Sequence, residues 1–198
     1  MRRLRTAILI SGRGSNMQAI LDAACSTAHP AEPVLVLTNR PDAAGLIIAE
    51  TYGVATTCID HKPYGKDREA FERAMQAVLE EHNVEMVVLA GFMRILTPWF
   101  VGRWSERMIN IHPSLLPKYP GLHTHQRAID AGDADAGCSV HWVTEGVDQG
   151  SVIAQARVTI EPEDTAETLA ARILPEEHAL YPIAVERAAL EILQRQKA

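Results

Sequence analysis

The chain has 198 residues, of which 47% are hydrophobic and 22% are charged. Both fractions are close to globular averages, so the chain can bury a core and is not disordered as a whole. Its formal net charge is -6, and its basic residues are scattered along the sequence instead of clustered. A protein that wraps nucleic acid with a basic surface is therefore excluded, and any anionic ligand must be bound locally.

No segment of the sequence indicates secretion or membrane insertion. The apolar runs fall far short of the roughly 20 residues that cross a bilayer, and the stretch at residues 7–10 is too short for a signal peptide. The three cysteines, Cys25, Cys58 and Cys138, are odd in number and form no CxxC pair. We therefore expect a protein of the reducing cytoplasm that binds no membrane.

The first half of the chain alternates between strand and helix patterns. Buried strands are predicted at residues 7–10, 34–38 and 87–90, and helices at 17–24, about 42–52 and 67–82. This alternation is typical of a doubly wound α/β sheet. Because the strands are continuously apolar, the pattern favours a parallel sheet covered by helices on both faces.

The second half follows a different pattern. A short apolar strand at residues 108–111 comes first, and extended segments at 139–144 and 151–160 come later. A turn at residues 145–150 separates these two segments, which is the spacing of a hairpin and not of a crossover. We therefore expect antiparallel strands at the C-terminal edge of the sheet.

The chain closes with a long helical pattern from residue 165 to about 194. Pro175 and Pro182 lie inside this pattern, and we expect each proline to interrupt the helix because it lacks a backbone N–H. The expected fold class is thus α/β. It is a single-domain doubly wound sheet with a parallel, Rossmann-like N-terminal half and an antiparallel C-terminal edge.

A glycine-rich loop, GRGSN at residues 12–16, follows the first predicted strand. Free backbone N–H groups and the helix dipole favour an anion at such a position, so a phosphate can rest on residues 14–16. A nicotinamide cofactor is disfavoured, because Met17 replaces a small residue of that motif and Asn39 replaces its acid. No Gly-Lys-Ser/Thr motif supports ATP binding, and a tight turn without a ligand remains an alternative.

A second candidate site surrounds the next buried strand. Asn110 and His112 alternate along its end and so point the same way. An amide donor beside an imidazole can stabilise an oxyanion and move a proton, as acyl transfer requires. Asp148, in the predicted hairpin turn, can orient the imidazole. The alternatives are a structural histidine and a carboxylate that only forms the turn.

Arg94 leaves a buried strand at the carboxyl edge of the predicted sheet, where ligands of open α/β sheets bind. Its neighbours Met93, Ile95 and Leu96 are apolar. This combination suits an acidic ligand that also carries a flat apolar ring. A surface ion pair of the same arginine is the alternative interpretation.

Four histidines, at positions 112, 123, 125 and 141, raise the question of a metal site. His123 and His125 lack the i, i+4 spacing that shares a helix face, and no HExxH or Cys/His knuckle occurs. We therefore expect no metal. We interpret His141 as a half-buried polar residue of a strand.

Five stretches, in order and over nearly the whole chain, resemble the phosphoribosylglycinamide formyltransferases, a folate-dependent family of purine synthesis. They are ILISGRGSNMQAI, LAGFMRIL, MINIHPSLLPKYPGLHTHQRAI, GCSVHWVTEGVDQGSVIAQ and EEHALYP. The resemblance implies a formyl transferase domain over residues 1–198. Residues 1–100 would form its nucleotide- and phosphate-binding half, and residues 101–198 its catalytic and folate-binding half.

The resemblance also implies a set of site residues through the matching motifs. The implied catalytic residues are Asn110, His112 and Asp148. The implied ribonucleotide-binding residues are Gly14, Ser15, Asn16, Pro113 and Glu177, with Glu177 at the ribose. The implied folate-binding residues are Arg68, Met93, Arg94, Ile95, Leu96, Thr144 and Val147.

The implied reaction moves the formyl group of 10-formyltetrahydrofolate, a co-substrate, to the amine of glycinamide ribonucleotide. Asn110 and protonated His112 would stabilise the oxyanion, and Asp148 would keep the histidine charged and help to relay the amine proton. Neither a metal nor a covalent enzyme intermediate is required. The implied partners are these two small molecules, without nucleic acid or membrane, and the chain would be a monomer or a homodimer.

Three positions depart from the family pattern near the turn: Gln149 and Ser151 replace a usual glycine and proline, and Trp142 replaces a usual phenylalanine. Two related enzymes of the same superfamily are alternatives. One of them, 10-formyltetrahydrofolate hydrolase, normally has an added N-terminal domain. Methionyl-tRNA formyltransferase has an added C-terminal domain and a basic surface. A non-catalytic nucleotide-binding module is a further alternative, since residue identity is not geometry.

Overall fold

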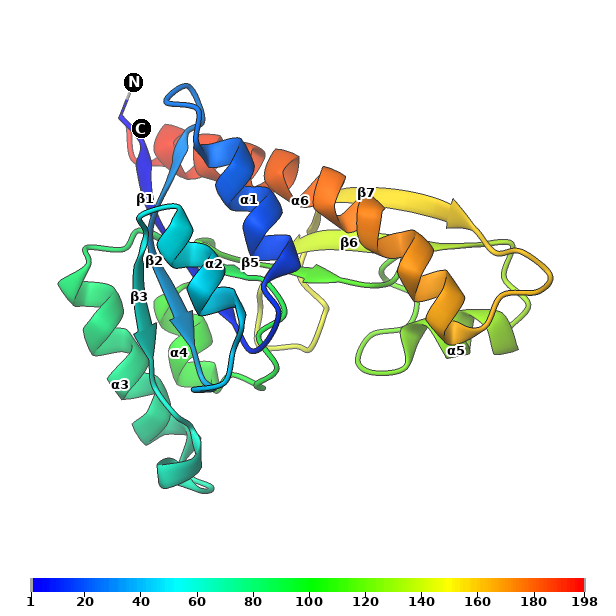
Figure 1. Cartoon of the computed structure of the whole chain (residues 1–198), viewed down its shortest axis with the longest axis horizontal. Helices are drawn as coiled ribbons and strands as arrows, with labels where there is room; N and C mark the ends of the chain where they lie inside the picture. The colour runs from blue at the N-terminus through cyan, green and yellow to red at the C-terminus, as the bar shows by residue number, and fades with distance from the viewer. Residues whose placement is uncertain (1, 198) are drawn as a thin grey trace.

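The structure is a computed structural model that describes residues 2–197, so that Met1 and Ala198, the two ends of the expected domain, lie outside the described residues. Within residues 2–197, seven strands form one sheet in the order β3-β2-β1-β4-β5-β6-β7 (Figure 1). The strands are β1 (Leu4–Ile10), β2 (Ala31–Thr38), β3 (Ala55–Cys58), β4 (Met86–Leu89), β5 (Met108–His112), β6 (Asp135–Trp142) and β7 (Val152–Thr159). The helices are α1 (Ser15–Ala24), α2 (Gly45–Thr51), α3 (Arg68–Glu81), α4 (Pro98–Arg103), α5 (Thr124–Asp130) and α6 (Ala166–Arg195), with a 3-10 turn η1 at Lys62–Tyr64.

The pairing of the strands confirms the expected α/β fold class. The strands β1 to β5 pair in parallel, while β6 pairs antiparallel with both β5 and β7. The hairpin of β6 and β7 therefore forms the antiparallel C-terminal edge. Its first strand begins at Asp135, four residues before the expected start at residue 139.

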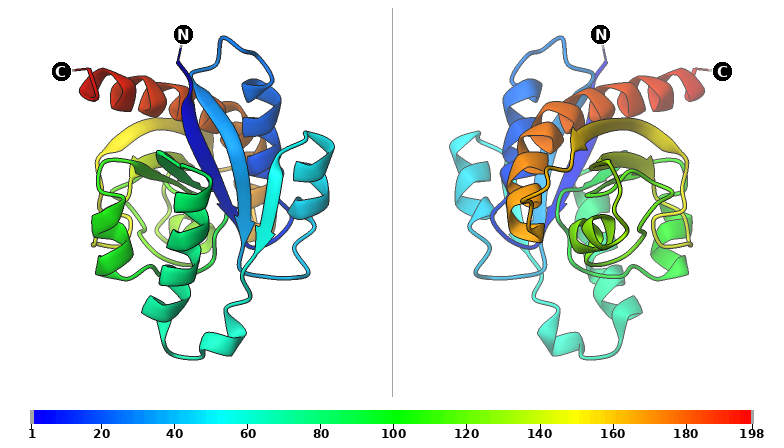
Figure 2. Two further views of the ribbon diagram at one scale, coloured as in Figure 1. Left: turned by 90° about the vertical axis from the view of Figure 1, so that its left-hand side faces the viewer. Right: turned by 90° about the vertical axis from the view of Figure 1, so that its right-hand side faces the viewer.

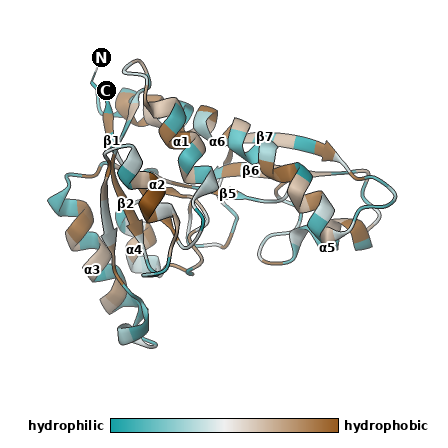
Figure 3. Ribbon diagram, viewed as in Figure 1, coloured by the Kyte–Doolittle hydropathy of each residue, from teal (hydrophilic) through white to brown (hydrophobic). Residues whose placement is uncertain are grey.

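Alternate residues of the central strand β1 enter two different hydrophobic cores. Ile8 and Ile10 face the core that α1 and α6 cover, whereas Ala7 and Leu9 face the core that α3 and α4 cover. Figure 2 shows these helices on opposite sides of the sheet, and Figure 3 shows hydrophobic residues along its central strands. Burial of both faces explains why the strand is continuously apolar.

The expected interruptions of the last helix are wrong. Helix α6 runs unbroken for 30 residues, with Pro175 and Pro182 inside it. A capping box of Thr165 and Thr168 closes its N-terminus. Its buried face, which includes Leu169, packs along the sheet, and this tertiary packing outweighs the hydrogen bonds that the prolines lack.

The sequence predicts none of three short elements, β3, α4 and α5, which are only four to seven residues long. Among residues 2–197, none of the helices combines the length and apolar character that a membrane crossing needs. The carboxyl ends of β1, β4 and β5 lie at one edge of the sheet, and the loops that follow them carry the candidate site residues.

Tyr181 links α6 to the sheet and provides a test of this packing. Its side chain is fully buried, and its hydroxyl donates a 2.8 Å hydrogen bond to the carbonyl oxygen of Leu89 in β4. We predict that Tyr181→Phe lowers the free energy of unfolding by about 1–2 kcal/mol, because a buried acceptor loses its donor.

Denaturant unfolding at equilibrium measures this loss, with Tyr52→Phe as the matched control. The Tyr52 hydroxyl bonds Asp22 on the exposed surface, so its removal changes the free energy of unfolding by only about 0.5 kcal/mol or less. Equal losses in the two variants would contradict the anchoring of α6 by Tyr181.

Candidate active site

The carboxylate of Asp148 lies between two imidazole rings. Its Oδ2 is 3.3 Å from His112 Nδ1, and its Oδ1 is 3.5 Å from His141 Nε2. The backbone N–H of Gly121 donates a 2.9 Å hydrogen bond to Oδ2. Asp148 has a φ of 54°, a left-handed conformation that turn-forming aspartates tolerate. The hairpin turn thus brings the carboxylate to the end of β5.

The strand register explains why the imidazole of His141 lies beside Asn110 and Asp148. Asn110 of β5 lies opposite His141 of β6, and Asn110 Nδ2 is 3.3 Å from His141 Nε2. His141 is 3% exposed, so its interpretation as a half-buried residue is wrong. Antiparallel pairing of the two segments is the signal that connects it to Asn110, but spacing along the sequence does not specify the register.

The surroundings of the Asp148–His112 pair favour the ionised form of the carboxyl. Burial opposes ionisation of Asp148, but hydrogen bonds from His141 and the Gly121 N–H, together with the nearby imidazoles, hold its pKa below its usual range. His112 Nε2 is 2.9 Å from the carbonyl oxygen of Tyr119. Both neighbours of this ring are acceptors, so a ring with hydrogens on both nitrogens satisfies both contacts.

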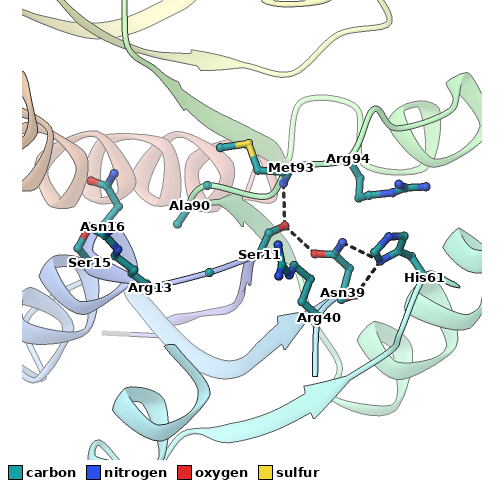
Figure 4. A pocket seen from close by; sticks show the side chains of 13 residues that line it. Ser11, Arg13, Ser15, Asn16, Asn39, Arg40, His61, Ala90, Met93 and Arg94 are labelled. Atoms are coloured by element: carbon teal, nitrogen blue, oxygen red, sulfur yellow. Dashed lines mark hydrogen bonds between the residues drawn. The ribbon is translucent and has the colours of Figure 1, made fainter. Parts of the chain in front are cut away.

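The glycine-rich loop borders a cavity of about 440 Å³, here named the loop cavity. Gly14 has a φ of 77° and precedes the first turn of α1. Figure 4 shows the lining of this cavity, which comes from the ends of β1, β2 and β3 and from the segment after β4. The lining residues are Ser11, Gly12, Arg13, Gly14, Ser15, Asn16, Asn39, Arg40, His61, Ala90, Gly91, Met93 and Arg94.

Glu177 of α6 reaches this loop through Asn16. Asn16 Nδ2 donates a 2.7 Å hydrogen bond to Glu177 Oε2, whereas Asn16 Oδ1 is buried with no hydrogen-bond partner among the described residues. Burial raises the pKa of Glu177, and only the hydrogen bond from Asn16 opposes that shift. An unpaired acceptor beside a buried carboxyl is a place where a ligand hydroxyl or N–H can bind.

A second cavity of about 190 Å³, here named the hairpin cavity, lies beside the β6–β7 turn. Arg94 lines both cavities, so the two adjoin at this residue. The hairpin cavity is lined by Leu89, Phe92, Arg94, Ile95, Leu96, Val101, Asn110, His141, Val143, Thr144, Glu145, Gly146, Val147 and Asp148.

Most of the predicted site residues therefore gather in two adjoining cavities. Four lie outside their linings: His112, whose ring contacts Asp148; Pro113, which follows His112; Glu177, which bonds Asn16; and Arg68, which donates a 3.4 Å hydrogen bond from Nη1 to the carbonyl oxygen of Ile95. Within residues 2–197, no three His, Cys, Asp or Glu side chains are arranged to hold a metal ion.

Comparison with known proteins identifies the family of this chain. The sequence pattern of the formyl transferase family matches residues 4–185. The chain belongs to the formyl transferase family. Phosphoribosylglycinamide formyltransferase of Escherichia coli K12 is 44% identical over 92% of this chain and 85% of its own length. This match confirms the resemblance drawn from the five sequence stretches.

Solved structures of the formyl transferase family superpose closely. Phosphoribosylglycinamide formyltransferase from Brucella melitensis has a TM-score of 0.89 at 49% identity, over 95% of this chain and 96% of its own. Glycinamide ribonucleotide transformylase 1 from Symbiobacterium toebii has a TM-score of 0.91 at 42% identity, over 96% and 89%. The chain spans only 14% and 19% of the trifunctional purine biosynthetic protein adenosine-3 of Drosophila melanogaster and Homo sapiens, at 46% and 42% identity over 93% and 98% of this chain.

Gly45, at the start of α2, fixes the position of the glycine-rich loop. Its N–H donates a 3.1 Å hydrogen bond to Gly12 O, and an added Cβ would lie 3.2 Å from Gly14 Cα and 2.4 Å from Ile10 Cδ1. We predict that Gly45→Ala displaces the loop and weakens binding of ribose 5-phosphate about tenfold, equivalent to about 1.4 kcal/mol. Calorimetric titration measures the Kd.

Gly102→Ala is the matched control, since the added methyl group would have no atom within 4 Å among the described residues, apart from its chain neighbours and the backbone of its own helix. This control should bind ribose 5-phosphate like the wild type. Unchanged binding by Gly45→Ala would show that the loop does not depend on close packing against α2.

Glu177 should lower the stability of the folded chain at neutral pH. Its pKa is raised in the folded state, so stability falls as the pH rises from about 4.3, the unfolded value, through the folded pKa. We predict that Glu177→Gln raises the free energy of unfolding at pH 7 and has no such effect at about pH 3, where the carboxyl is protonated in both states.

Urea unfolding at the two pH values tests this sign, with Glu176→Gln as an exposed neighbour on the same helix. Equal effects of the two substitutions at pH 7 would contradict the burial cost assigned to Glu177.

Proposed function

We propose that the chain transfers the formyl group of 10-formyltetrahydrofolate to the primary amine of glycinamide ribonucleotide, in purine biosynthesis. The observation that carries the proposal is the placement of Asp148 and two imidazoles beside two adjoining cavities. One cavity begins at a glycine-rich helix N-terminus that suits a phosphate, and the other suits a flat ring. The names of similar relatives, phosphoribosylglycinamide formyltransferases, support formyl transfer to the ribonucleotide.

In the proposed reaction the substrate amine attacks the formyl carbon. A new C–N bond forms while the formyl oxygen takes the negative charge of a tetrahedral intermediate. The bond between that carbon and the folate nitrogen then breaks, and the amine proton moves to the departing nitrogen. Formylated ribonucleotide and tetrahydrofolate are the products, so the atoms balance without a metal or an oxidant.

Asn110 and His112 stabilise the oxyanion in this proposal. Asn110 Nδ2 lines the hairpin cavity as a neutral donor, and a protonated His112 adds positive charge beside it. His112 Nε2 faces Tyr119 O, so the protonated ring stabilises the oxyanion through its charge and not through a direct hydrogen bond from Nε2. Asp148 holds the proton on His112 and relays the amine proton through water.

The substrates occupy the two cavities. Gly14, Ser15 and Asn16 bind the ribonucleotide phosphate, Glu177 binds the ribose and Pro113 lines its path to His112. The folate lies against Met93, Arg94, Ile95, Leu96, Thr144 and Val147, with Arg68 at its acidic end. Arg94 lines both cavities, which supports placing the two substrates next to each other.

The remaining parts of the proposal concern organisation and location. The chain acts as one domain, with phosphate binding in residues 1–100 and catalysis and folate binding in residues 101–198. It acts in the cytoplasm as a monomer or a homodimer, on small molecules only, with neither nucleic acid nor membrane as a partner and with no metal.

Loss of the formyl group from 10-formyltetrahydrofolate, followed by absorbance with and without glycinamide ribonucleotide, tests the function. The proposal requires deformylation that depends on the ribonucleotide and yields the formylated product. Release of formate without the ribonucleotide would favour the hydrolase alternative. Absence of turnover would favour the nucleotide-binding module.

The assigned residues give a sharper prediction. We expect His112→Ala and Asp148→Asn each to lower kcat by about 10²- to 10⁴-fold, the usual contribution of acid–base groups. The Kd for the ribonucleotide should stay near that of the wild type, because the phosphate binds elsewhere. Asp135→Asn, at the far end of β6, is the matched control. Wild-type turnover in either variant would remove that residue from the mechanism.

A further inference from the structure

The segment between β4 and α4, residues 90–97, presents apolar side chains to solvent. Met93 is 76% exposed and Ile95 is 69% exposed. Residues 90–97 belong to no helix or strand, so the regular hydrogen bonds of such elements do not determine the conformation of this segment. Exposure of large apolar side chains to water is unfavourable. Other contacts must therefore keep Met93 and Ile95 exposed.

Ser11, directly after β1, makes two hydrogen bonds to the first half of this segment. Its backbone N–H donates a 3.1 Å hydrogen bond to Gly91 O, and its Oγ accepts a 2.8 Å hydrogen bond from the Met93 N–H. Ser11 is 6% exposed. A buried hydroxyl that accepts from a loop N–H fixes the backbone at that residue, since the N–H would otherwise lack a partner.

Asn39, at the end of β2, sets the direction of the Ser11 hydroxyl. Ser11 Oγ donates a 2.6 Å hydrogen bond to Asn39 Oδ1, which leaves a lone pair free for the Met93 N–H (Figure 4). Asn39 is 2% exposed, and its Nδ2 lies 3.2 Å from His61 Nδ1. Hydrogen bonds therefore connect Ser11 after β1 to Asn39 after β2, and Asn39 to His61 after β3.

Glu72 of α3 holds the other end of the segment. Its Oε1 accepts a 2.7 Å hydrogen bond from the Thr97 N–H, and its Oε2 accepts from the Thr97 hydroxyl. Glu72 is 1% exposed. Both of its oxygens act on one residue, so this carboxyl fixes the point where the segment enters α4.

We propose that Ser11, Asn39 and Glu72 are positioning residues for the folate substrate. They hold residues 90–97 at both ends, so that Met93 and Ile95 project as a preformed surface for the flat apolar part of that substrate. A preformed surface binds more tightly because less conformational freedom is lost on binding. The identity of the ligand rests on the proposed function, whereas the fixed conformation of the segment does not.

Amide hydrogen exchange of the full chain tests the fixed conformation. In Ser11→Ala the Met93 amide should exchange about tenfold faster than in the wild type, since it loses its acceptor. Thr6→Val is the matched control: it also removes a buried hydroxyl from β1, one that donates to Leu4 O far from residues 90–97. Unchanged Met93 exchange in Ser11→Ala would overturn the proposal.

Steady-state kinetics separate positioning from a general loss of stability. Glu72 lines neither cavity, so Glu72→Gln should raise the KM for 10-formyltetrahydrofolate about tenfold and change the KM for the ribonucleotide by about twofold or less. Thr6→Val should change neither. Equal increases of both KM values would overturn the positioning role.

Substitution of Asn39 gives a rescue test. Asn39→Asp keeps an oxygen that accepts from the Ser11 hydroxyl, whereas Asn39→Leu removes it at similar volume. The proposal requires a folate KM near the wild-type value for Asn39→Asp and a raised value for Asn39→Leu. Equal values would overturn it. A wild-type chain without formyl transfer would refute the proposed function, while Met93 exchange would still decide whether Ser11 holds the segment.

Discussion

The candidate site depends on one largely buried carboxylate, that of Asp148, which contacts groups from three parts of the chain. Its contacts are His112 at the end of β5, His141 in β6 and the N–H of Gly121 in the segment before α5. A buried charge is tolerated only with such partners, because burial alone would drive the carboxyl to its neutral form. The contacts that keep Asp148 ionised thus also fix the hairpin turn against the sheet.

Around this carboxylate, the topology of the sheet assembles two different kinds of binding surface. The parallel strands end in loops, and the loop after β1 leads into the N-terminus of α1, a position where free N–H groups favour an anion. The antiparallel hairpin supplies the wall of the second cavity and the carboxylate itself. A parallel crossover at this edge would have placed a helix where the turn of residues 145–150 stands.

Sequence reasoning succeeded where the physical signal is local. Residues 7–10 and 87–90 are apolar on both faces, and this predicted buried parallel strands that the structure confirms. It failed where distant contacts decide: α6 continues through Pro175 because its packing against the sheet outweighs the local cost. His141 and Ser11 lie within the motif stretches, but only strand register and loop packing give them their partners.

A ¹³C NMR titration of the Asp148 carboxyl carbon, assigned by its absence from Asp148→Asn, tests the central claim most directly. The structure places the pKa of this carboxyl below its usual range, despite its burial. The account therefore predicts a carboxylate signal from pH 8 down to below about 3.9, the ordinary aspartate value. Titration at or above that value would mean that the imidazoles do not hold the charge on Asp148, and the proposed proton relay would lose its basis.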